Sequence, residues 1–157
     1  MTTIMQKIWG NKYFRLIAVL LLSIGLLCGC SADDTNISGT EQISLAEDGS
    51  YTSPEDVAEY LHFYGHLPDN FITKNEARDL GWDSQDGNLA EVAPGMSIGG
   101  DSFGNREGLL PKADGRKYYE CDVNYEGGYR GGERIVYSND GLIFYTDDHY
   151  KSFEQLY

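Results

Sequence analysis

Near the end of the chain, His149 follows two carboxylates, Asp147 and Asp148. Acidic side chains are in excess throughout, because the 157 residues contain 25 Asp and Glu against 12 Lys and Arg. A negative charge beside an imidazole favours its protonated form. The pattern therefore makes His149 a candidate proton donor, and the alternative interpretation is a surface histidine at the end of a strand.

Three residues closer to the N-terminus could act together with His149. Glu120 lies on the polar side of an alternating segment over 116–125, which predicts a strand. Arg134 begins the next apolar segment and alternates with its core-facing residues, and Arg130 precedes it in a glycine-rich loop. We expect one carboxylate, one histidine and two arginines to line a shallow groove. Taken singly, each could instead be an ordinary surface charge.

This set of side chains suits the cleavage of a phosphodiester in RNA. The ribose 2′-hydroxyl is the nucleophile of that reaction, so the protein needs neither a covalent nucleophile nor a metal. A carboxylate can accept the hydroxyl proton, an imidazolium can donate to the departing 5′-oxygen, and guanidinium groups can stabilise the charge on phosphorus. Ordinary pKa values of about 4.3 for glutamate and about 6.5 for histidine allow both states in mildly acidic solution. We expect Asp147 and Asp148 to extend that window upward.

The first 29 residues predict an export signal. Three cations and no acid precede an apolar run from Leu16 to Cys28, whose 13 residues are too few for a spanning helix of about 20. The letters "LLCGC" then resemble a bacterial lipobox, in which Cys30 would carry the lipid. We expect a lipoprotein on the outer face of the cell membrane. Because Cys28 is unusual at its position, ordinary cleavage with secretion and a retained membrane anchor remain alternatives.

Residues 30–52 are polar and acidic without a clear period, which predicts a flexible tether. One globular domain is expected over residues 53–157, and we expect it to be a monomer. With Cys30 lipidated, Cys121 would be the only thiol of the mature chain, so no internal disulfide could form. Its place on the core side of a strand favours a buried apolar role over a nucleophilic one.

Capping residues and periodicity predict helices followed by strands. Ser53 and Gly65 are typical of a helix start and end, and Thr73 with Glu76 forms a capping box for a second helix. The predicted helices cover residues 53–65, 73–81 and 88–93, and the predicted strands cover residues 116–125, 134–138 and 142–146. A hairpin turn is expected at "NDG". The fold class is therefore α+β, with the helices on the apolar face of an antiparallel sheet whose other face is polar and open.

Five segments resemble successive parts of the barnase-type ribonucleases, a family of guanyl-preferring bacterial enzymes. They read "YLHFYGHLPDNFITKNEARDLGW", "GNLAEVAPGMSIGGDSFGNREGLLP", "GRKYYECDVNY", "YRGGERIVYS" and "TDDHY". The resemblance runs from about Pro54 to Tyr157, which is essentially the whole predicted domain. It implies a microbial ribonuclease fold and cleavage of single-stranded RNA 3′ of guanosine, by way of a 2′,3′-cyclic phosphate, without a cofactor.

The resemblance also implies roles for individual residues. Glu120 falls at the position of the general base and His149 at that of the general acid. The phosphate-stabilising positions are filled by Lys74, Arg130 and Arg134, and the substrate-binding positions by Phe103, Asn105, Arg106, Glu107, Tyr129 and Tyr150. Within the second group, "FGNREG" matches the guanine-reading loop, in which Glu107 would accept hydrogen bonds from the base.

The charge of the chain departs from that of basic family members. Residues 51–157 contain 9 Lys and Arg against 20 Asp and Glu, although the stretch from Arg106 to Arg134 is balanced. Met96 and Leu109 stand where a basic relative has lysines. Because neutralisation of phosphate charge dominates the affinity of proteins for nucleic acids, we expect this domain to bind long RNA weakly. The alternative function is a binding module that keeps the fold and has low catalytic activity. An acidic enzyme would also be poorly attracted to the small acidic barstar-like inhibitor that the resemblance implies.

Overall fold

The computed structural model describes residues 45–157. The predicted export signal, the lipidation site Cys30 and most of the predicted tether lie outside the described residues. Within the described part, no helix is both long enough and apolar enough to cross a membrane.

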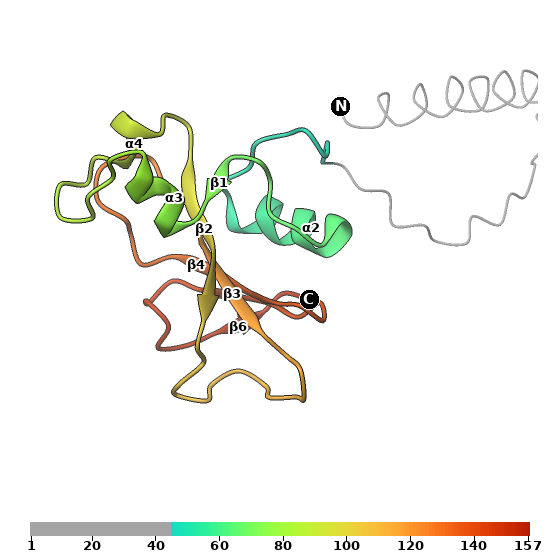
Figure 1. Cartoon of the computed structure of the whole chain (residues 1–157). Helices are drawn as coiled ribbons and strands as arrows, with labels where there is room; N and C mark the ends of the chain where they lie inside the picture. Colours follow the sequence, from blue (N-terminus) through green and yellow to red (C-terminus); the bar gives the residue numbers. More distant parts are fainter. Residues whose placement is uncertain (1–44) are drawn as a thin grey trace, which may run out of the picture. The chain divides into compact units, whose positions relative to one another are not determined.

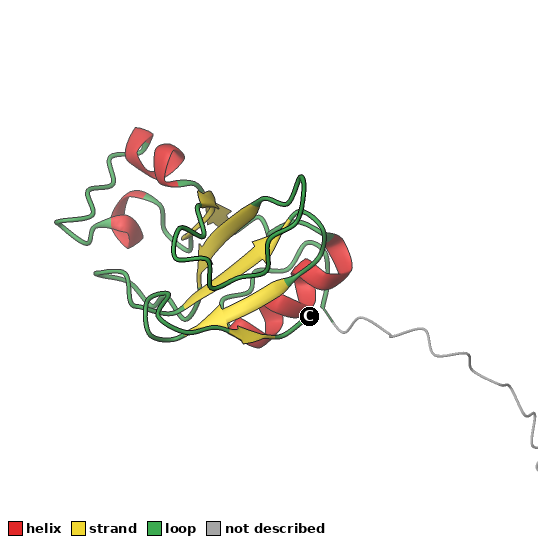
Figure 2. Ribbon diagram, turned by 90° about the horizontal axis from the view of Figure 1, so that it is seen from below, coloured by secondary structure: helices red, strands yellow, loops and turns green. Residues whose placement is uncertain are grey.

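Among the described residues, three helices and six strands are joined by long loops (Figures 1 and 2). The elements are α2 (Pro54–Tyr64), β1 (Phe71–Ile72), α3 (Lys74–Asp79), α4 (Leu89–Val92), β2 (Ser97–Phe103), β3 (Tyr118–Asp122), β4 (Arg134–Ser138), β5 (Ile143–Thr146) and β6 (Glu154–Gln155). All three predicted helices and all three predicted strands are present, so the α+β prediction is confirmed. Strands β1, β2 and β6 were not predicted, because β1 and β6 contain 2 residues each and β2 has no apolar alternation.

Helix α2 is fixed at both ends by the residues that predicted it. The Ser53 side chain accepts a hydrogen bond from the Asp56 N–H at 3.1 Å. Gly65 ends the helix in the left-handed region, with φ at 73°, and its N–H donates to the Leu61 carbonyl at 3.0 Å. The apolar side of the helix, including Val57, packs against β4 and β5 on one face of the sheet (Figure 2).

The six strands described form one sheet in the order β1 to β6. Strand β1 runs parallel to β2, and every other neighbouring pair is antiparallel. The register decides which polar residues meet. Glu120 of β3 lies opposite Asp101 of β2, and Asp122 of β3 lies opposite Arg134 of β4. The sheet thus places three carboxylates and an arginine on neighbouring strands.

The second face of the sheet is polar at one end only, because its other end is apolar and buried, so the prediction of a face that is polar and open throughout was wrong. At the buried end, Tyr118, Val136 and Phe144 of the sheet form an apolar cluster with Leu110. Leu110 comes from the loop between β2 and β3, and Phe153 packs on the cluster from the C-terminal segment. The reason lies in adjacent apolar residues: Ile135 and Val136 of β4 are both fully buried, although neighbours in a strand point to opposite faces. Both faces therefore need a cover.

The folded domain begins before the predicted boundary at Ser53. The Asn70 side chain donates to the Tyr51 carbonyl at 2.9 Å and accepts from the Tyr51 N–H at 3.2 Å. The Tyr60 hydroxyl donates to the Glu47 carbonyl at 2.8 Å. Sequence could not show this, because the partners of this acidic segment lie in distant parts of the domain. Its backbone is therefore held by side chains of the domain and does not act as a tether from residue 45 onward.

Replacing Asn70 by alanine should lower the free energy of unfolding by about 1–3 kcal/mol, because both backbone groups of Tyr51 lose their partner. Urea denaturation of the purified protein measures the change. Asn75→Ala is the matched control, since Asn75 is exposed on α3 and should change stability by less than about 0.5 kcal/mol. Equal effects of the two substitutions would show that Asn70 does not hold the segment.

Candidate active site

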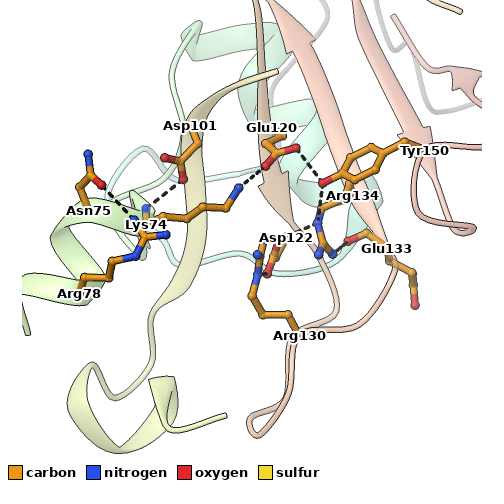
Figure 3. A network of polar contacts seen from close by, with 10 residues as sticks. All are labelled: Lys74, Asn75, Arg78, Asp101, Glu120, Asp122, Arg130, Glu133, Arg134 and Tyr150. Atoms are coloured by element: carbon orange, nitrogen blue, oxygen red, sulfur yellow. Dashed lines mark hydrogen bonds and ion pairs between the residues drawn. The ribbon is translucent and has the colours of Figure 1, made fainter. Parts of the chain in front are cut away.

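Residues from five parts of the chain meet around Glu120 of β3 (Figure 3). Strand β3 supplies Glu120 and the start of β4 supplies Arg134, while Arg130 comes from the loop between those strands. Lys74 is the first residue of α3, and Tyr150 follows β5. Figure 3 shows the Lys74, Glu120 and Tyr150 side chains in one row, with the two arginines beside them.

Glu120 is the centre of this row and is only 8 % exposed. One carboxylate oxygen accepts from Lys74 Nζ at 2.5 Å and the other from the Tyr150 hydroxyl at 2.7 Å. Burial raises the pKa of Glu120, but the hydrogen bonds from Lys74 and Tyr150 and the charges of Lys74 and Arg130 outweigh it, so the pKa lies below its usual range. The side chain is therefore an ionised carboxylate at neutral pH, ready to accept a proton.

Tyr150 donates to Glu120 as a neutral phenol. Its pKa is raised by burial and by the adjacent Glu120 carboxylate. The same hydroxyl oxygen accepts from Arg134 Nε at 3.2 Å. Tyr150 thus joins the carboxylate to one of the two arginines.

Both arginines are held by Asp122, a carboxylate that sequence analysis did not single out. Arg130 donates to its two oxygens at 2.6 and 2.7 Å, and Arg134 Nε lies 2.9 Å from Oδ1. Asp122 is 2 % exposed and Arg134 is 3 % exposed. Arg134 was expected on an open surface. That expectation was wrong because the guanidinium is drawn into the sheet by Asp122, its cross-strand neighbour.

Lys74 is aimed at Glu120 by the start of α3. The predicted capping box is present, with Thr73 accepting from the Glu76 N–H and Glu76 accepting from the Thr73 N–H. The Lys74 N–H donates to an Asp101 oxygen at 2.9 Å. Because the backbone of Lys74 is attached to β2 through Asp101, its side chain can extend across to β3.

His149 lies exposed at the edge of this group, on the loop after β5. Its ring centroid is 4.8 Å from that of Tyr150, and both residues have left-handed backbone angles, with φ at 58° and 71°. A cavity of about 470 Å³ is lined by His149, Arg130 and Arg134 together with Trp82 and Tyr129. The sequence-predicted histidine and arginines therefore line one pocket, and Glu120 is joined to it through Tyr150.

Asp148 shapes the loop that carries His149. It accepts hydrogen bonds from the Thr146 hydroxyl, the Lys151 N–H and the N–H and hydroxyl of Ser152, at 2.7 to 3.0 Å. The bonds from Ser152 and from the other donors lower the pKa of Asp148 to about 2. None of these bonds goes to the imidazole of His149. The carboxylate therefore holds the turn, and the expected effect of its charge on His149 stays a prediction.

The predicted guanine-reading loop lies at the other end of β3. Asn105 has φ at 41°, and its side chain bonds to the backbone of Leu110 at 2.9 and 3.1 Å. This closes the loop and leaves Arg106 and Glu107 exposed at its tip. Phe103, at the base of the loop, packs on Tyr150 with 5.3 Å between ring centroids. The loop thus contacts the Glu120 site through an aromatic pair.

Tyr129 and Cys121, which were also discussed from the sequence, take no part in the contact between Phe103 and Tyr150. Tyr129 is 70 % exposed and its hydroxyl donates to the Gln85 carbonyl at 3.1 Å, on the side of His149. Cys121 is fully buried, as expected, and burial raises the pKa of its thiol. Among residues 45–157, no group of three His, Cys, Asp or Glu residues is arranged to hold a metal ion.

Replacing Asp122 by asparagine should lower the free energy of unfolding by about 3–5 kcal/mol, because two guanidinium groups then lose their buried counter-charge. Urea denaturation measures the loss. Glu126→Gln removes an exposed carboxylate nearby and should change stability by less than about 0.5 kcal/mol. If Asp122→Asn behaved like this control, the buried pair would not hold the site together.

Comparison with known proteins shows the family of the chain. A family model described as ribonuclease matches residues 54–157. Ribonucleases of Heyndrickxia coagulans and Bacillus intermedius are each 58 % identical to this chain over 100 residues, which are 64 % of its length. The match covers 92 % of the Heyndrickxia protein and 62 % of the Bacillus protein. The guanyl-specific ribonuclease St of Saccharopolyspora erythraea is 46 % identical over 55 residues, 34 % of this chain and 54 % of that protein. The chain belongs to the ribonuclease family.

Proposed function

We propose that this domain is an endoribonuclease that cleaves single-stranded RNA 3′ of guanosine without a metal ion. The observation that carries the proposal is the Glu120 carboxylate, held ionised between Lys74 and Tyr150 beside the paired arginines. A buried carboxylate surrounded by cations is suited to a general base next to a phosphate group.

In the first step, Glu120 takes the proton of the ribose 2′-hydroxyl and the 2′-oxygen attacks phosphorus. The bond from phosphorus to the 5′-oxygen of the next nucleotide breaks, and His149 donates a proton to that oxygen. The products are a 2′,3′-cyclic phosphate and a free 5′-hydroxyl. In the second step, His149 accepts a proton from water, the water oxygen attacks phosphorus, and Glu120 returns its proton to the 2′-oxygen. The product is a 3′-phosphate.

The arginines are suited to stabilising the charge that develops on phosphorus. Asp122 occupies Nε and one Nη of Arg130, and the bonds of Arg134 use Nε and Nη1. Within the described residues, Arg130 Nη1 and Arg134 Nη2 have no hydrogen-bond partner. A guanidinium fixed on one side can offer its remaining N–H groups to phosphate oxygens without further reorganisation.

The preference for guanosine is supported by the loop that Asn105 closes. Its exposed Glu107 can accept hydrogen bonds from the ring N–H and amino group of guanine. The name of the Saccharopolyspora relative points to the same base. We also keep the export signal, the lipid on Cys30 and the extracellular location as parts of the proposal. They rest on the N-terminal sequence alone.

The proposal is tested by incubating the purified protein with the dinucleotide GpU in the presence of EDTA. Wild type should produce guanosine 2′,3′-cyclic phosphate, and Glu120→Gln and His149→Gln should each lower kcat/KM by about 10²–10⁴. His62→Gln is the control for histidine replacement, since His62 lies on α2. Absence of cleavage by wild type would favour the binding module of low activity. Equal rates for wild type and both variants would exclude the assigned acid and base.

The acid limb of the pH profile should also report Glu120. Activity requires the ionised carboxylate, so kcat/KM falls as pH drops through its pKa, which lies below the ordinary glutamate value of about 4.3. Tyr150→Phe and Lys74→Gln each remove a donor that favours the charged form, so each should move the acid limb to higher pH. Tyr125→Phe removes a hydroxyl that bonds to the Gly128 carbonyl and not to Glu120, and it should leave the limb in place. An unmoved limb in the first two variants would assign the base to another group.

A further inference from the structure

A second cavity, of about 580 Å³, lies at the opposite end of β3 from the pocket of His149. Tyr118, the first residue of β3, lines this cavity, whereas Arg134, opposite the last residue of β3, lines the His149 pocket. The two ends of this strand are about 13 Å apart at about 3.3 Å per residue. We call the second cavity the basic pocket. Its lining residues are Ser102, Phe103, Gly104, Asn105, Arg106, Lys112, Ala113, Arg116, Lys117 and Tyr118.

The basic pocket holds an unusual share of the positive charge. Residues 45–157 contain nine Lys and Arg residues, and four of them line this pocket. Arg116 is paired with Asp140 at 2.7 Å. Within the described part of the chain, Arg106, Lys112 and Lys117 have no ion-pair partner, although carboxylates outnumber cations more than twofold there. Three unpaired cations around one cavity favour an anionic ligand.

The basic pocket is built on the same loop that is proposed to read guanine. A side chain at Gly108 would come within 3.6 Å of Lys112 Nζ, so this ammonium group lies against the loop. The segment between β2 and β3 is held at its C-terminal end by the turn between β4 and β5, because the Lys117 N–H donates to Asn139 Oδ1 at 2.7 Å. Arg116 Nη1 donates to the Pro111 carbonyl at 3.0 Å. Lys112, Arg116 and Lys117 therefore lie on a segment whose backbone is held by hydrogen bonds.

The direction of a bound strand follows from the roles of His149 and the loop. His149 donates to the departing 5′-oxygen, so the nucleotide downstream of the cut lies on its side. Guanosine lies upstream of the cut, against the loop of Asn105 and Glu107. The basic pocket is lined by residues of that loop and of the segment that follows it, at the end of β3 opposite the His149 pocket. Its place on this upstream side suits the phosphate that joins guanosine to the preceding nucleotide. Lys and Arg groups along a groove commonly track a single-stranded backbone in this way.

We propose that Arg106, Lys112 and Lys117 form a binding site for the RNA phosphate on the 5′ side of the guanosine. This inference rests on the proposed function, because that function sets the direction of the strand. The site would raise affinity for substrates that extend upstream of guanosine. It would not act on a dinucleotide such as GpU, which has no phosphate there.

The test uses three deoxytrinucleotides d(TpGpT), which lack the 2′-hydroxyl and so are not cleaved. One has two ordinary linkages, one has a neutral methylphosphonate at the upstream linkage, and one has it at the downstream linkage. Wild type should bind the ordinary trimer about fivefold more tightly than the upstream-neutral one. The salt slope, measured by calorimetry at several ionic strengths, should be steeper by about 0.7 for the ordinary trimer.

We call the affinity for the ordinary trimer divided by that for the upstream-neutral one the upstream ratio. The double variant Lys112→Gln with Lys117→Gln should reduce this ratio to below about two, because two of the three cations of the site are lost. The same variant should not change the downstream ratio, which compares the ordinary trimer with the downstream-neutral one, because the downstream linkage lies beside the catalytic residues. Lys151→Gln is the control, since it removes an exposed cation outside the basic pocket and should preserve both ratios.

An upstream ratio of one in wild type, or a ratio unchanged in the double variant, would overturn the site. A loss confined to the downstream ratio would overturn the assigned direction of the strand. Cleavage of GpU by wild type is measured in parallel. Without cleavage the proposed function fails, whereas the binding ratios still decide whether the basic pocket holds the upstream phosphate.

Discussion

The site depends on one buried carboxylate between two guanidinium groups. Asp122 binds Arg130 and Arg134 together, and so joins β3, β4 and the loop between them. Guanidinium groups stay charged in proteins, so without Asp122 the two side chains would repel one another and turn toward solvent. Burying such a cluster is costly in desolvation and is a poor way to gain stability. Its benefit is positional, because it fixes two cations beside Glu120 before any phosphate arrives.

The base and the acid of the proposed reaction are held in different ways. Glu120 is enclosed, with a lysine on one oxygen and a tyrosine on the other. His149 is exposed and depends on a turn with positive φ angles, which Asp148 stabilises by four hydrogen bonds. The hydrogen bonds from Lys74 and Tyr150 keep the carboxylate ionised and fix its orientation. Exposure lets the imidazole meet both a leaving oxygen and, in the second step, a water molecule.

Local features of the fold could be predicted from sequence, whereas features that depend on distant partners could not. The caps of α2 and α3 and the strand β3 each follow from residues a few positions apart, and all were confirmed. The burial of Arg134 depends on Asp122, which sequence alone does not place opposite it. The anchoring of the segment before Ser53 depends on Asn70 in the same way.

Similar limits apply to the site and to the sheet. Glu120, Arg130, Arg134 and His149 could be named because their residue types and order fit one reaction. Asp148 was assigned to His149 from adjacency in sequence, yet its carboxylate turns toward Ser152. The covered face of the sheet was missed because its cover, Leu110 and Phe153, comes from loops without periodicity. Loop residues carry no pattern that shows which surface they pack on.

The acidic composition of the domain is compatible with a phosphate-binding site because of where its few cations lie. In physiological salt, a surface charge acts over about 8 Å, so a phosphate responds mainly to its nearest neighbours. Lys74, Arg130 and Arg134 gather around Glu120, and the basic pocket adds four more cations at the other end of β3. The excess carboxylates elsewhere act over longer distances, and chiefly on the approach of a long polyanion. Composition therefore governs how fast RNA arrives, whereas the two cationic ends of β3 govern where its phosphates bind.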